Sequence, residues 1–65
     1  MKIYDILIKD VYTDEKRSET MQCDETADIR DIHKQAMKVI KVAEDIECIR
    51  TNNQLVYTID RGFLA

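Results

Sequence analysis

Apolar and polar positions alternate along four segments of this chain and recur with a helical period in a fifth. Residues 3–12, 17–23, 45–51 and 54–60 are rich in alternating or continuous apolar side chains, and we expect them to be β-strands. Residues 26–43 place apolar side chains about every 3.6 positions, which predicts one amphipathic helix. The expected order is strand, strand, helix, strand, strand, which is typical of the α+β class.

Two opposed stripes follow the expected helix. The apolar stripe, which requires cover, consists of Ile29, Ile32, Ala36, Ile40 and Ala43. The basic stripe, which faces water or a partner, consists of Arg30, Lys34, Lys38 and Lys41. Thr26 is the expected N-cap, and acids near the start with lysines in the later turns favour the helix dipole. We therefore expect the helix to lie on a sheet with its basic stripe outward.

The strand pattern also predicts how the strands pair. Residues 3–12 are apolar on both faces, as in a central strand, whereas residues 17–23 are more polar, as at an edge. A four-residue turn joins these two strands in the predicted hairpin. Asn52 and Asn53 favour a two-residue type I′ turn, and that turn would place Cys48 opposite Tyr57.

The first and fourth strands are the more apolar pair, so we expect them to lie side by side. A right-handed crossover through the helix makes the second and third strands parallel. The result is a ββαββ domain with a four-stranded mixed sheet of order 2-1-4-3, and the helix packs on one face. This layout is β-grasp-like at the level of the fold, an analogy that carries no function.

The sheet face without the helix is the first candidate for a binding site. Its predicted apolar side chains are Ile3, Leu7, Val11, Ile49 and Val56. A contiguous apolar patch on so small a domain usually marks an interface, which predicts a homodimer or a partner protein docked on this face. The alternative is a half-polar surface that tolerates scattered apolar residues.

Composition limits the remaining possibilities. The 65 residues form one small domain, near the lower size limit for folding alone, and the net charge is −3. Residues 29–43 carry four bases and one acid, so the helix is a positive ridge on an acidic body. No apolar run is long enough to cross a membrane, and the start of the chain lacks the features of a signal peptide. Two cysteines are too few for a disulfide scaffold, and we expect a reduced, cytoplasmic protein.

The residues that could carry chemistry are sparse. Cys23, His33 and Cys48 are the soft metal ligands, but no two are spaced as a local zinc pair, and we expect both thiols to be buried on the helix side of the sheet. Gly62 is the only glycine, which leaves no phosphate-binding loop. We therefore predict no metal, no cofactor, no small-molecule substrate and no enzymatic activity.

The basic stripe supports three interpretations. It can be a solvated helix face, a docking site for an acidic protein, or a contact for nucleic-acid phosphates. The function that we predict is a non-enzymatic protein-binding module of the adaptor or inhibitor type, a type that phages and plasmids often encode. It would act through the open sheet face, the basic stripe or both. The alternative is a nucleic-acid-binding protein that uses the basic stripe.

Overall fold

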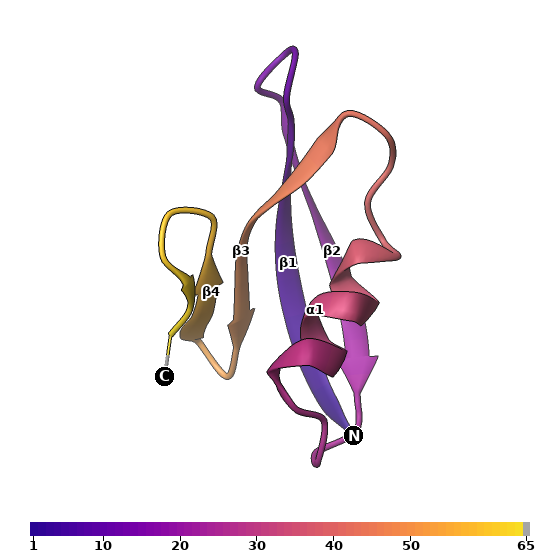
Figure 1. The fold of residues 1–65 in the computed structure, drawn as a ribbon, viewed down its shortest axis with the longest axis vertical. Coiled ribbons are helices and arrows are strands. Elements are labelled where there is room, and N and C mark those ends of the chain that lie inside the picture. The colour runs from indigo at the N-terminus through magenta and orange to yellow at the C-terminus, as the bar shows by residue number, and fades with distance from the viewer. Residues whose placement is uncertain (65) are drawn as a thin grey trace.

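The computed structural model describes residues 1–64 as one sheet with a helix on one side (Figure 1). Its elements in chain order are β1 (Lys2–Asp10), β2 (Lys16–Cys23), α1 (Ile29–Met37), β3 (Glu44–Thr51), β4 (Gln54–Thr58) and β5 (Gly62–Phe63). The strand order is β2-β1-β3-β4-β5, and every neighbouring pair is antiparallel. None of the helical residues in the described part of the chain forms a helix long and apolar enough to span a membrane.

The predicted four-stranded mixed sheet of order 2-1-4-3 is therefore wrong. The sheet has five strands, its neighbouring pairs are all antiparallel, and β3 rather than β4 pairs with β1. Leu7 of β1 lies opposite Cys48 of β3, and the pairing extends along most of both strands. β4 has five residues against eight in β3, and it ends at Thr58. Ile59, which made this segment look more apolar, lies in the following turn and is 48% exposed. The longer strand offers more ladder bonds and more buried isoleucine, so it takes the central place.

Both predicted hairpins are present. The first closes on a four-residue loop, with the Asp10 N–H donating to the Glu15 carbonyl at 2.8 Å and the Asp14 N–H donating to the Asp10 carbonyl. The second turns at Asn52 and Asn53, which have φ values of 51° and 62° as a type I′ turn requires. A β-strand also follows the second hairpin, because Gly62–Phe63 folds back beside β4.

Two register shifts decide which side chains share a face. Between β1 and β3 the register moves by one residue so that Glu47 has no partner on β1. Between β3 and β4 a second shift leaves Val56 without a partner and places Tyr57 opposite Ile49. The predicted register, with Cys48 opposite Tyr57, holds only next to the turn and is wrong beyond it. Since side-chain direction alternates, each shift moves the following residues to the other face.

The core lies between the sheet and α1. Its largest fully buried side chains are the isoleucines at 6, 8, 46 and 49, each no more than 1% exposed. Ile32 and Ala36 of α1 cover them, as the apolar stripe predicts. Ile40 is partly buried against the same cluster, whereas Ile29 is 52% exposed. The sheet and helix thus bury one face only.

The helix is shorter than predicted at both ends. Asp28 is the N-cap, its side chain accepting from the Asp31 N–H at 3.0 Å, so the choice of Thr26 was wrong. After Met37 the Lys38 and Val39 N–H groups bond three residues back, which tightens and ends the helix. Ala43 adopts a left-handed backbone with φ 69°, so the helix does not extend to this residue as predicted.

Arg17 ties the end of the helix segment to the sheet. Its Nε and Nη2 donate to the two carboxylate oxygens of Glu44, each at 2.9 Å, and Nη2 also reaches the Val39 carbonyl at 3.3 Å. Nη1 bonds Glu19 on the same strand. The hydrogen bonds from Arg17 and from the Lys41 backbone N–H lower the pKa of Glu44 to about 2.

Candidate functional site

The sheet face opposite α1, which we call the open face, is built by β2, β1, β3 and β4. Residues opposite one another in a ladder share a face, so Leu7 of β1 and Cys48 of β3 lie together at its centre. Arg50 lies opposite both Asp5 on β1 and Leu55 on β4. Leu7 and Cys48 are half-buried and Leu55 is 39% exposed, although α1 covers none of them.

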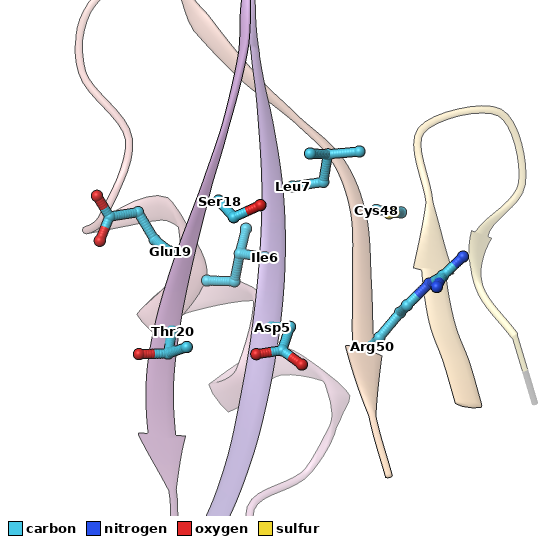
Figure 2. A pocket seen from close by; sticks show the side chains of 8 residues that line it. All are labelled: Asp5, Ile6, Leu7, Ser18, Glu19, Thr20, Cys48 and Arg50. Carbon is cyan, nitrogen blue, oxygen red and sulfur yellow. The ribbon is translucent and has the colours of Figure 1, made fainter. Parts of the chain in front are cut away.

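A depression of about 610 Å³ lies in this face above β2, β1 and β3 (Figure 2). In Figure 2, seen from the side opposite α1, Leu7 and Cys48 lie at one end of the depression and Asp5 at the other. Ser18 and Thr20 project from β2 at its outer side, and Arg50 extends from β3 toward β4. The depression is open along one side, so a side chain presented by another surface can enter it.

Charges on the open face are paired at one end and unpaired at the other. Near the β1–β2 turn, Lys9 Nζ lies 3.3 Å from Asp14, and Lys16 Nζ lies 3.1 Å from Glu47. At the opposite end Asp5 and Arg50 are directly opposite each other, yet within residues 1–64 neither has an oppositely charged group within 4.0 Å. The apolar centre is therefore flanked by one acid and one base that have no ion partner there.

The structure brings together only part of the predicted apolar patch. Leu7 lies at the centre of the open face, and Ile3 lies at the end of β1 with 57% exposure. Val11 lies beyond β1 in the turn and is 49% exposed. Ile49 is fully buried on the α1 side, and Val56 sits at the bulge of β4 and packs against the core. The placement of Ile49 and Val56 on the open face was therefore wrong, and the two bulges are the reason.

Sequence reasoning missed Cys48, Arg50 and Leu55 as residues of this face. It placed Cys48 and Leu55 under the helix because it assumed an unbroken alternation along β3 and β4. The available signal was Ile46 followed three residues later by Ile49, since two large apolar residues at that spacing can face one core only across a bulge.

The residues of the basic stripe lie partly in α1, partly at its C-cap and partly in the segment after it. Arg30 and Lys34 are exposed on α1, Lys38 is its C-cap, and Lys41 lies in the segment that leads to β3. All four side chains are exposed. Because the helix ends at Met37, the regular helical spacing that defined the stripe holds only for its first half. Whether these residues bind anything stays a prediction.

The two thiols lie on different faces of the sheet. Cys23 is buried on the α1 side, where burial raises its pKa and the charge of Asp31 adds to the effect. Cys48 is half-buried on the open face, so the expectation that it lies under the helix was wrong. His33 packs instead near Tyr57 and Phe63, with ring centroids 6.0 and 6.1 Å away. Cys23, His33 and Cys48 thus occupy separate parts of the described chain.

No family model, curated protein or solved structure matches this chain. A shallow hollow with an apolar centre and unpaired charges suits recognition of another surface, because it offers burial and two directional contacts together.

Proposed function

We propose that this protein is a non-enzymatic protein-binding module that acts through the open face. The observation that carries the proposal is the unpaired Asp5 and Arg50 beside the half-buried Leu7 and Cys48. A partner covering this face gains apolar burial at the centre, and it supplies ion partners for two charges at the rim. The adaptor or inhibitor class remains part of this proposal.

The chemistry of the face defines the partner that fits it. The depression takes one apolar side chain over Leu7 and Cys48. A basic group of the partner would meet Asp5 and an acidic group would meet Arg50, so the complementary segment carries both charges around an apolar anchor. We propose a protein partner with such a segment, acting in the reducing cytoplasm, where Cys48 stays a thiol.

The experiment uses Cys48 as a native attachment point. A short photoreactive maleimide on Cys48 is irradiated in a native lysate, and the cross-linked peptide of the captured protein is identified by mass spectrometry. The purified partner is then titrated against the wild type and against Leu7→Lys and Arg50→Glu. We expect each substitution to weaken binding by about tenfold or more, since each removes a central contact.

A matched control carries the same label on the other side of the molecule, in Cys48→Ser with Gln35→Cys on α1. Capture of the same protein from both sites would contradict binding at the open face. Unchanged affinity of Leu7→Lys and Arg50→Glu would also overturn the proposal. Cross-linking of this chain to itself through Cys48 would identify a second copy, rather than a foreign protein, as the occupant of the face.

The nucleic-acid alternative is tested by the same purified protein. Lys34, Lys38 and Lys41 are each changed to Glu, and retention on DNA and RNA columns at low salt is compared with that of the wild type. Retention that disappears in the variant would support nucleic-acid binding through the basic stripe. Wild-type protein that is not retained would exclude it.

A further inference from the structure

β2 is one of the two outer strands of the sheet, and its outward backbone groups can be identified. The Asp10 N–H to Glu15 carbonyl bond closes the β1–β2 hairpin, and hydrogen-bonded pairs alternate along an antiparallel ladder. Arg17, Glu19 and Met21 therefore bond to β1. The residues whose N–H and C=O groups point away from the sheet are exposed: Lys16, Ser18, Thr20 and Gln22.

Two of the devices that usually prevent pairing at a sheet edge, a bulge and a proline, are absent from β2, and its charged Arg17 and Glu19 side chains lie on the α1 side, where they bond to each other. Its register with β1 runs without a shift from Lys2–Cys23 to Lys9–Lys16, so no bulge bends it. The chain has no proline. A lysine often protects such an edge, but the Lys16 ammonium lies 3.1 Å from Glu47 of its own chain. β2 thus offers eight residues without a bulge or a proline to a second strand.

We propose that β2 pairs antiparallel with β2 of a second copy, about a two-fold axis at Ser18, to form one continuous sheet. In this register Ser18 lies opposite Ser18 of the second copy, and Lys16 lies opposite Thr20, so outward backbone groups meet outward groups. Arg17 then lies opposite Glu19 of the second copy, and the same pair forms twice by symmetry.

Charge selects this register over its neighbours. A two-fold axis at Glu19 would place the two Glu19 carboxylates directly opposite each other, which is unfavourable. An axis at Thr20 would place Arg17 opposite Cys23 and form no ion pair within β2, since Lys16 would lie opposite Asp24, which is beyond the end of the strand. With the axis at Ser18, the Arg17 guanidinium can donate a hydrogen bond to Glu19 of the second copy. One N–H of Arg17 Nη1 has no acceptor within residues 1–64 and is available for it.

The dimer extends the open face without covering it. A two-fold axis perpendicular to the sheet keeps both open faces on the same side. Ser18 and Thr20, which border the depression, then lie next to their counterparts, and the two depressions adjoin across the new strand pair. This inference is independent of the proposed function, because pairing uses the edge of β2 rather than Leu7, Cys48 or Arg50.

Disulfide trapping tests the register directly. Ser18→Cys and Thr20→Cys are each made with Cys48→Ser, and both are oxidised at micromolar concentration. We expect most of the Ser18→Cys protein to become a covalent dimer, since the two Ser18 positions face each other. Thr20→Cys is the matched control on the same edge, and it should stay largely monomeric. Trapping through Thr20 instead, or through neither residue, would overturn the proposal.

A backbone substitution tests the pairing in the reduced protein. Thr20→Pro removes an outward N–H without breaking a bond to β1, whereas Thr20→Val keeps that N–H. By sedimentation at about 100 μM, a concentration that favours association, we expect about twice the monomer mass for the wild type and Thr20→Val, and the monomer mass for Thr20→Pro. A monomeric wild type, or a dimeric Thr20→Pro with native circular dichroism, would contradict the proposal.

The two proposals fail separately. Leu7→Lys should lose the partner and remain dimeric, whereas Thr20→Pro should become monomeric and still bind the partner at each open face. If Thr20→Pro does not fold, trapping through Ser18 still decides the register.

Discussion

The two faces of the sheet are made by the same strands and nevertheless have opposite roles. On the α1 side, Ile46 and Ile49 are almost completely buried. On the open side, Cys48 lies between them in the sequence but is only half-buried, opposite Leu7. The difference comes from the unpaired Glu47, not from hydrophobicity, since a bulge lets two isoleucines three residues apart point the same way. One inserted residue therefore decides which side chains hold the fold together and which are left for a partner.

The largest expected effect is a difference in the free energy of unfolding between truncations on the two faces. Ile49→Ala should lower the free energy of unfolding by about 2–5 kcal/mol, because it leaves a cavity in the core. Leu55→Ala, an apolar truncation on the open face, should cost about 1–1.5 kcal/mol, because Leu55 is already 39% exposed. Urea unfolding of both variants measures the difference. Equal losses would show that α1 does not protect one face more than the other.

A second prediction concerns the ion network on the α1 side. The pKa of Glu44 is lowered to about 2, below its ordinary value of 4.5, so its ionised form is stabilised in the folded protein. This contribution is complete above about pH 4.5 and is lost as the pH falls toward 2. Glu44→Gln should therefore reduce the melting temperature at neutral pH. It should also make the melting temperature decrease less as the pH is lowered from 4.5 to 2.

The control for Glu44 is Glu15→Gln, which removes a carboxylate from the exposed turn after β1. If both variants change the acid dependence equally, the general loss of a carboxylate would account for the result. If neither does, the contacts of Glu44 with Arg17 and the Lys41 N–H contribute nothing to acid stability.

The smallest expected effect tests at which residue α1, the helix that covers one face, begins. Asp28→Ala should cost about 1 kcal/mol, because the Asp28 side chain caps the Asp31 N–H. Thr26→Ala should cost less than about 0.5 kcal/mol, since Thr26 bonds Asp24 outside the helix. Thermal unfolding of the pair is the measurement. A larger loss at Thr26 would move the start of the helix back to the residue predicted from sequence.

Much of the local structure was predictable from single segments of sequence. The β1–β2 hairpin, the Asn52–Asn53 turn, and the burial of Ile32 and Ala36 all follow from patterns within a few residues. The strand neighbours were not predictable in the same way, because the choice between β3 and β4 depends on the length of pairing with β1. Ile59 misled that choice, since its apolar character says nothing of the turn in which it lies.

The candidate site was predictable as a face but only partly as a set of residues. Leu7 followed from alternation along β1, which has no bulge in its pairing with β2. Cys48, Arg50 and Leu55 lay beyond a register shift, where alternation from the turn no longer gives the correct side. Arg50 and Asp5 could be recognised as a charged pair without ion partners only after their strands were known to be neighbours.

The position of β1 between β2 and β3 has a consequence for how the molecule forms. The β1–β2 hairpin can form from adjacent sequence. The pairing of β1 with β3 is different, because Leu7 and Cys48 are separated in the chain by β2 and α1. Ile6 and Ile8 therefore stay without their main packing partners until the segment around Ile46 and Ile49 arrives. We therefore expect the β1–β2 hairpin to form early in folding and the pairing of β3 with β1 to complete the core later.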